Sequence, residues 1–134
     1  MLECAALVKA DLDAKGLNSI AKEYEDGNVV INFPYGKNVV KCIFSGELGE
    51  YVSLYLQFES VPEDKLVDVV FVCNELNSKF KWVKFYVDSD RDLMLEDDAI
   101  LTTETAADEV FELLLRMIKI SDDVKPEIMK AIYA

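Results

Sequence analysis

The stretch YVSLYLQFE, which spans Tyr51–Glu59, has the strictest two-residue alternation in the chain. Because side chains two positions apart lie on the same face of a β-strand, this alternation separates two different faces. One face carries Tyr51 and Tyr55 together with smaller polar residues. The other face is entirely apolar and consists of Val52, Leu54, Leu56 and Phe58. Such a strand is stable only in a sheet whose apolar face is covered, which predicts a second layer.

After Pro62 the spacing of the apolar residues changes from two to three and four. That spacing is typical of an amphipathic helix, and proline is well placed in a first helical turn. The apolar stripe consists of Leu66, Val69, Val70, Cys73 and Leu76. The same periodicity predicts a short helix over residues 3–15 and a longer helix from about Thr103. We expect Ser121 and the two aspartates after it to begin a last short helix, with Pro126 near its start.

Shorter alternating stretches predict further strands on both sides of the helix that follows Pro62. Three come before the first alternating stretch, the first two of them joined by a hairpin turn at Asp26-Gly27. Two more, KWVKFYVD and LMLE, come after the helix. The resulting order, α-β-β-β-β-α-β-β-α, predicts an α+β fold with two layers, in which an antiparallel sheet has its helices packed on one face. With 134 residues, the chain is expected to form a single domain over residues 1–134.

The segment VDSDRDLMLEDD places aspartates at alternate positions, as at the start of an EF-hand calcium loop. A loop that began at Asp88 would need glycine at its sixth position and glutamate at its twelfth, where this chain has Leu93 and Ala99. The flanking residues also alternate as strands instead of repeating as helices. We therefore interpret Asp88–Asp92 as a hairpin turn and predict no metal site, although weak cation binding there stays open. The acids that follow, Glu96–Asp98, are expected to lie in a solvated loop.

The chain contains no histidine, which removes the commonest general base and the commonest transition-metal ligand. It also lacks GxSxG, GxGxxG and phosphate-binding glycine loops. The three cysteines are far apart and lie among apolar neighbours, so we expect buried, reduced thiols and neither a disulfide nor a zinc site. Cys4 is the thiol most open to acidification, because it lies close to a helix start. These features predict a protein that is not an enzyme, with no catalytic residues, cofactor or metal.

The net charge of −12, from 26 acidic and 14 basic residues, disfavours nucleic acid and anionic membranes as partners. The N-terminus lacks the positive charge and the unbroken apolar core of a signal peptide. No apolar run is long enough to cross a bilayer. We therefore expect a cytoplasmic protein.

The second half of the chain contains CNELNSKFKWVKFYVDSDRDLMLEDD and, after an interval, ETAADEVFELLLRMIKI. This segment contains, in order, a helix ending in Asn-x-Leu-Asn, an aromatic strand, an acidic hairpin and an amphipathic closing helix. In this order of features it resembles the YbjN-like family of bacterial sensory transduction regulators. Asn74, Leu76 and Asn77 match the Asn-x-Leu-Asn pattern, whereas a glycine expected in the hairpin is absent. The resemblance covers about Pro62–Ile120. It implies the fold of type III secretion chaperones, which are small, acidic, usually dimeric and independent of ATP.

The two asparagines of this pattern also have a physical interpretation as structural residues. Asn77 lies where the helix must stop, and asparagine tolerates the left-handed conformation of a helix end. The amide of Asn74, one turn earlier, could hydrogen-bond the backbone of the hairpin against which it packs. We expect neither residue to be a ligand.

The side of the sheet that faces away from the helices is the predicted functional surface. Strand parity places four aromatic residues there, and at about 150 Å² each they would present roughly 600 Å². One partner in a standard interface buries about 800 Å², so a patch of this size suits a protein interface. The predicted interface consists of Tyr51, Tyr55, Trp82, Tyr86 and Met94. The alternative is that part of the chain, with the last helix as the candidate, folds over this face.

The sequence therefore predicts a non-enzymatic protein-binding module. In this interpretation it is a chaperone-like or regulatory homodimer that uses the outer face of its sheet, with a protein or peptide client as a further partner. The alternative is a small-molecule-binding protein or an unrecognised enzyme with a pocket between the sheet and the helices, which would require convergent polar groups there.

Overall fold

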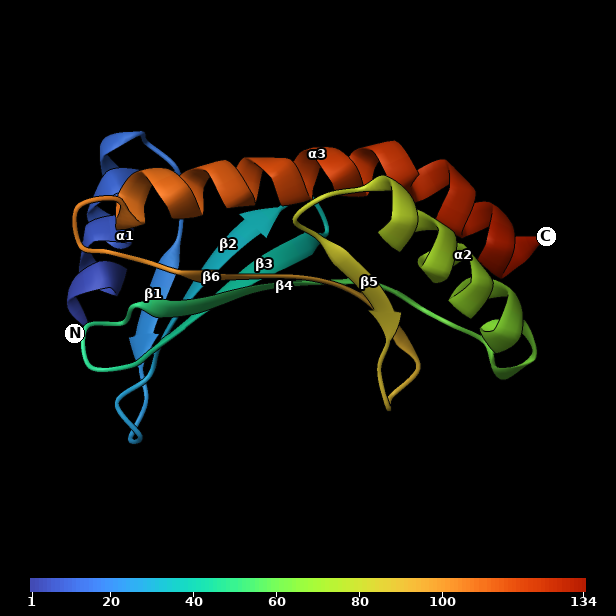
Figure 1. The fold of residues 1–134 in the computed structure, drawn as a ribbon, viewed down its shortest axis with the longest axis horizontal. Coiled ribbons are helices and arrows are strands. Elements are labelled where there is room, and N and C mark those ends of the chain that lie inside the picture. Colours follow the sequence, from blue (N-terminus) through green and yellow to red (C-terminus); the bar gives the residue numbers. More distant parts are fainter.

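Six antiparallel strands form one curved sheet, and all three helices pack on the same face of it (Figure 1). The computed structural model describes every residue of the chain, 1–134. The helices are α1 (Glu3–Ala14), α2 (Leu66–Lys79, after a 3-10 turn at Glu63–Lys65) and α3 (Ala106–Tyr133). The strands are β1 (Ile20–Glu23), β2 (Val29–Tyr35), β3 (Asn38–Ser45), β4 (Tyr51–Ser60), β5 (Lys84–Val87) and β6 (Asp92–Ile100).

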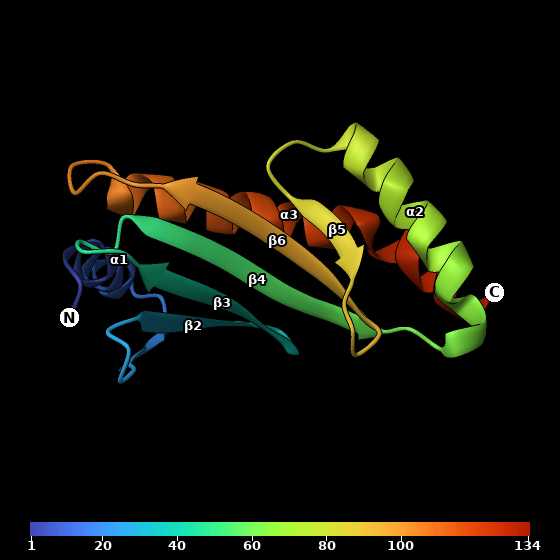
Figure 2. The same cartoon turned by 60° about the horizontal axis from the view of Figure 1, so that its bottom comes forward.

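The strand order across the sheet is β1-β2-β3-β4-β6-β5. β4 and β6 are the longest strands and pair from Tyr51–Ile100 at one end to Ser60–Asp92 at the other. Figure 2 shows α3 running behind these two strands, with α1 at one end of the molecule and α2 at the other. The α+β class, the antiparallel sheet and the order of elements predicted from the sequence are thus confirmed.

The helix-facing side of the sheet contributes to a single cluster of 30 buried residues. In β4, Val52, Leu54 and Leu56 are almost fully buried, as the alternation predicted. Fully burying a side chain of this kind stabilises the fold by about 1.5–3 kcal/mol relative to leaving it exposed. The two-residue period of β4 therefore identified correctly which face of the sheet the helices cover.

α2 buries a narrower stripe than its sequence predicts. Val69, Cys73 and Leu76 pack into the core, whereas Val70 is about half-exposed, so its assignment to the buried stripe was wrong. Because consecutive residues are about 100° apart around a helix, Val70 points well away from Val69 and from the core.

The closing helix α3 is a single helix of 28 residues, so the separate last helix predicted at Ser121 is wrong. Ser121 is buried, and its hydroxyl donates to the carbonyl of Ile118 within the helix at 2.7 Å. Pro126 removes one helical hydrogen bond. The apolar stripe nevertheless continues across it through the buried Val124 and Ile128, and this packing offsets the loss. No helix in the structure, α3 included, is long and apolar enough to cross a membrane.

β6 ends at Ile100 and not at Glu96, where the predicted strand LMLE ends, and it includes the three acids that we expected in a solvated loop. Glu96, Asp97 and Asp98 all pair with β4 inside the strand. The alternation that buries Leu93 and Leu95 carries Asp97 to the same inner face, where it is 4% exposed and one carboxylate oxygen has no hydrogen-bond partner. Burial raises the pKa of Asp97 to about 6, with a smaller contribution from the charge of Asp98.

A side chain closes the free edge of β5. The Oδ1 atom of Asn77 accepts a hydrogen bond from the N–H of Phe85 at 2.7 Å, and its Nδ2 atom donates to the carbonyl of Phe85 at 3.0 Å. The amide thus pairs with β5 as a neighbouring strand would, which blocks this edge to other chains. We expected such a contact from Asn74, which is exposed instead. Asn77 does not end the helix either, because α2 continues to Lys79.

Replacing Asn77 with alanine is expected to lower the free energy of unfolding by about 1–3 kcal/mol, because the buried N–H and C=O groups of Phe85 lose their partners. Chemical denaturation measures the loss. Asn74→Ala, three residues earlier on α2 and exposed, is the matched control and should change the stability by less than about 0.5 kcal/mol. Equal losses in the two variants would contradict a structural role for the amide of Asn77.

Stability should also depend on the ionisation of Asp97. The unfolded chain ionises this residue above about pH 4, but the folded protein resists ionisation up to its pKa of about 6, so wild-type stability should fall across this window. Asp97→Asn stays neutral. Relative to wild type, its free energy of unfolding should therefore rise by roughly 2–3 kcal/mol between pH 4 and pH 7.

Urea denaturation of both proteins at each pH measures this difference, in which the effects of the other carboxylates cancel. Glu47→Gln, at an exposed loop position, is the control and should show a difference from wild type that does not change with pH. A pH-independent difference for Asp97→Asn as well would show that Asp97 ionises normally in the fold.

Candidate functional site

The outer face of the sheet bears no helix (Figure 2). The strand registers align its side chains in rows that cross several strands. One row joins β3, β4, β6 and β5 and consists of Lys41, Tyr55, Glu96 and Lys84. The next row consists of Gln57, Met94 and Tyr86. Because α3 lies on the opposite face, the suggestion that the last helix folds over these side chains is wrong.

A groove of about 680 Å³ hollows this outer face along β3 and β4. Its apolar lining consists of Val39, Ile43, Tyr55, Phe58 and Met94. Its polar lining consists of Lys37, Asn38, Lys41, Gln57, Glu59 and Ser60. We call this feature the outer groove. It continues into a second hollow of about 680 Å³ near α3, because Lys37, Asn38, Phe58 and Glu59 line both.

A β-bulge in β4 shapes the outer groove. Gln57 pairs with Met94 on β6, but Glu59 pairs with the adjacent Leu93, so Phe58 is an extra residue between them. A bulge of this kind bends the strand and redirects its side chains. Phe58, which we expected inside the core with the other apolar residues of β4, is therefore only partly buried and lines the groove.

The outer groove is locally basic, although the chain as a whole is strongly acidic. Lys37 and Lys41 line it, and neither lysine takes part in an ion pair. Glu59 is the single acidic residue in the lining. Two ammonium groups are thus available to a group of opposite charge that enters the groove.

Next to the outer groove, on β5 and β6, charged groups are already paired. Lys84 lies 3.2 Å from the carboxylate of Glu96 and 3.5 Å from that of Asp98, and the hydrogen bond to Glu96 raises the pKa of Lys84. The hydroxyl of Tyr86 donates to Glu96 at 2.7 Å. Burial and this hydrogen bond raise the pKa of Tyr86. The network fixes the Tyr86 ring beside the groove and keeps it uncharged.

The residues predicted as an interface do not form one continuous patch. Tyr55 and Met94 line the outer groove, and the partly buried Tyr86 lies beside it. Tyr51 is at the far end of β4, opposite Ile100, where it is about half-exposed. The exposed aromatic area is therefore smaller than predicted, and the groove with its aliphatic lining is the main feature of this face.

Trp82 does not lie on the outer side of the fifth strand, and this part of the prediction is wrong. Trp82 precedes β5, which begins at Lys84, so the strand alternation does not apply to it. Its backbone φ is 70°, and its indole ring lies beside the guanidinium group of Arg116 on α3, 5.3 Å from Cζ to the ring centroid. Trp82 is therefore associated with the helices and not with the outer groove.

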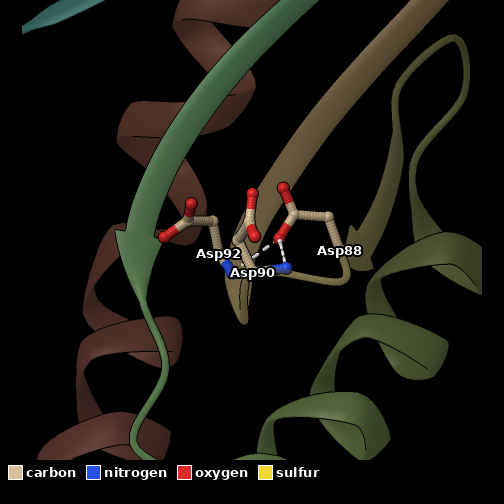
Figure 3. A group of neighbouring side chains, drawn as sticks. All are labelled: Asp88, Asp90 and Asp92. Atoms are coloured by element: carbon tan, nitrogen blue, oxygen red, sulfur yellow. Dashed lines mark hydrogen bonds between the residues drawn. The ribbon is translucent and has the colours of Figure 1, made fainter.

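Three aspartates come close together at the hairpin between β5 and β6, with carboxylate oxygens within 4.8 Å of one another (Figure 3). The Oδ1 atom of Asp88 accepts hydrogen bonds from the N–H groups of Asp90 and Asp92, at 3.0 and 2.9 Å. Asp92 in turn accepts one from the hydroxyl of Ser60 at 3.0 Å. The chain turns at Arg91, whose φ is 61°. The predicted hairpin is therefore present, and its carboxylates stabilise the turn.

The three cysteines are free and buried. Burial raises the pKa of Cys42 to about 12 and that of Cys73 to about 11. Burial, together with the charges of Glu3 and Glu50, also raises the pKa of Cys4, so the helix start does not acidify this thiol. A thiol that is protonated at neutral pH is a poor nucleophile. None of the three therefore provides an activated thiolate.

A second apolar surface, which was not predicted from the sequence, lies on α2. Val67 and Phe71 are 69% and 67% exposed, and Val70 is exposed beside them. We call these three residues the α2 apolar face. The sequence does indicate an exposed apolar surface here, because the run VVFVC within α2 has more consecutive apolar residues than one buried helix stripe can accommodate.

Two solved structures have folds similar to this one. The first is that of the type III secretion chaperone SycH of Yersinia pestis in complex with a stable fragment of YscM2, with a TM-score of 0.60 and 13% identity over 90% of this chain and 98% of the matched chain. The second is the heterodimeric ExoU-SpcU complex from the type III secretion system of Pseudomonas aeruginosa, with a TM-score of 0.51 and 13% identity over 94% of this chain and 98% of the matched chain. At such low identity the likeness shows the fold alone.

The sequence itself matches a family over almost its whole length. No curated protein matches the chain. The model of the family described as "YbjN: Putative bacterial sensory transduction regulator" matches residues 5–128, which extends well beyond the segment on which the resemblance was based. This chain therefore belongs to the YbjN family.

Proposed function

We propose that this protein is a non-enzymatic, protein-binding module of the cytoplasm, which works as a chaperone-like or regulatory homodimer. A client protein would bind on the outer face of the sheet. The observation that carries this proposal is the outer groove of about 680 Å³ on a face that no helix covers.

The composition of the outer groove supports a protein partner. Met94 and Tyr55 are of the residue types that are enriched at interface cores, and Val39 and Ile43 add aliphatic surface beside them. The unpaired ammonium groups of Lys37 and Lys41 would attract acidic side chains and set the orientation of the client. The groove therefore suits a client segment whose apolar residues are flanked by acidic ones.

The family and the similar structures support the same role. The family is described as one of regulators, and both similar structures contain proteins of type III secretion together with a protein partner. We propose that this chain uses the shared fold to hold part of another protein without chemical change. The absence of histidine and of an activated thiolate supports a non-enzymatic role, and free, buried thiols suit a reducing compartment.

The homodimer is best assigned to the α2 apolar face. Val67 and Phe71 are far more exposed than Tyr55 in the outer groove, so burying them against a second copy removes more apolar surface from water. Self-association through α2 also leaves the outer groove open for a client. The sequence had predicted the homodimer on the outer face, and the two assignments can be separated by experiment.

Substituting Tyr55→Glu or Met94→Glu should abolish client binding, because each places a carboxylate in the apolar lining of the groove. Affinity capture from the native host, quantified by mass spectrometry, measures the proteins retained by each variant. Tyr24→Glu, at an exposed tyrosine before the β1–β2 turn, is the matched control and should retain the wild-type set. The proposal fails if both groove variants retain every protein that the wild type retains.

Substituting Phe71→Glu should convert the dimer to a folded monomer and so halve the molar mass measured by light scattering after size exclusion. Ile20→Glu, at an equally exposed apolar residue on β1, at the other end of the molecule from α2 (Figure 1), is the control and should leave the mass unchanged. A change in mass with Tyr55→Glu instead would place the homodimer on the outer face. A monomeric wild-type protein would contradict the homodimer altogether.

A further inference from the structure

A small basic cavity beside Trp82 differs in charge from the rest of this acidic chain. Its volume is about 310 Å³, and it is lined by residues from the end of α2, the loop before β5 and the middle of α3. Four of the chain's 14 basic residues line it: Lys79, Lys81, Arg116 and Lys119. Asp123 is the single acidic residue in the lining, although the chain has 26 acids in total. Positive charge is therefore concentrated at this cavity.

Three of these cations have no partner of opposite charge. Lys79, Lys81 and Lys119 form no ion pair, whereas Arg116 is bound to Glu112 at 2.8 Å. Lys79 has a local explanation, because the last turn of a helix favours cations, but Lys81 lies outside the helices and Lys119 is in the middle of α3. Like charges around one cavity repel one another unless an anion neutralises them, and such a cavity concentrates anions.

Trp82 supplies an aromatic wall to this cavity. Arg116 lies over the ring, and the side chain is still 57% exposed, so a large part of the indole is available for contact. The N–H of Val83 bonds to the carbonyl of Lys81 at 2.8 Å across Trp82, whose φ is 70°. A three-residue turn of this kind is rare and strained, above all for a bulky residue. Strain that presents an aromatic ring to solvent indicates a function for the ring other than core packing.

We propose that this cavity binds a nucleoside phosphate, with the base stacked on Trp82 and the phosphate held by Lys81 and Lys119. Stacking on an aromatic ring accommodates any planar base. Several unpaired lysines match the multiple charge of a phosphate better than the single charge of a carboxylate. The volume is at the lower end of ligand pockets and suits a mononucleotide. A nucleic acid would require a longer basic stripe, which this chain lacks.

This site is independent of the function proposed above, because Trp82 lies with the helices while the outer groove is on the opposite face. Trp82 is also the only tryptophan of the chain, so intrinsic tryptophan fluorescence reports on this cavity alone. The full chain is titrated with ADP and UDP, and with adenosine and pyrophosphate as the separate halves of the ligand. ADP or UDP should quench the fluorescence saturably, and each half should bind at least about tenfold more weakly.

Reversing one charge in the cavity tests the role of the lysines. Lys81→Glu and Lys119→Glu should each weaken ADP binding by about tenfold or more, because a charge-assisted contact is replaced by repulsion. Lys22→Glu on β1, at the opposite edge of the sheet, makes the same change in net charge and should alter the affinity by no more than about twofold. Circular dichroism of each variant checks that the fold is retained.

The proposal is overturned by any of four results. These are no saturable quenching by ADP or UDP, pyrophosphate binding as tight as ADP binding, an equal loss of affinity in Lys22→Glu, and tighter binding of a short single-stranded oligonucleotide than of either nucleotide. The second result would indicate a simple anion site without stacking, and the last would indicate a nucleic-acid surface.

Discussion

Burial of one apolar sheet face beneath three helices holds this protein together. The inner residues of β4 and β6 meet the long stripe of α3, while α1 and α2 pack at the two ends of the molecule. Because strand residues alternate, the same constraint directs every second side chain to a face that nothing in the chain covers. The outer groove follows from this one-sided packing, since Tyr55 and Met94 must point away from the helices if their neighbours point toward them.

Three local features of the sheet distinguish this fold. The bulge at Phe58 hollows the outer face by breaking the register of β4 with β6. The parity of β6 draws Asp97 into the core, where an unpaired carboxylate opposes folding once it ionises. Asn77 uses its side-chain amide to replace a missing strand beside β5. The last of these protects an edge that otherwise invites pairing between chains.

The two candidate binding regions share an excess of positive charge. In a chain with a net charge of −12, unpaired lysines gather both in the outer groove and around Trp82. Outside these two hollows, four basic residues have acidic partners, namely Lys9, Lys15, Lys84 and Arg91, whereas the remaining four lysines have none. The acidic surface elsewhere would repel an anionic partner, so the two hollows, in which unpaired lysines lie close together, are the places proposed for such a partner.

Local periodicity and turn chemistry are enough to predict the order of elements, the side of the sheet that the helices cover and the aspartate hairpin. The extent of α3, the position of Trp82 and the length of β6 depend on contacts between segments that are distant in the sequence. Ser121 and Pro126 are residues typical of a helix start. Packing of the continuous apolar stripe nevertheless makes α3 a single helix that includes both. The sequence pattern predicts Trp82 within a strand, but the loop before β5 places it beside Arg116. It also predicts Asp97 and Asp98 in a loop, but pairing with β4 includes both in β6. In each case a contact between segments that are distant in the sequence outweighs the local conformational preference. The reason is that burying a side chain contributes more free energy than the intrinsic propensity of a residue for a helix or a loop.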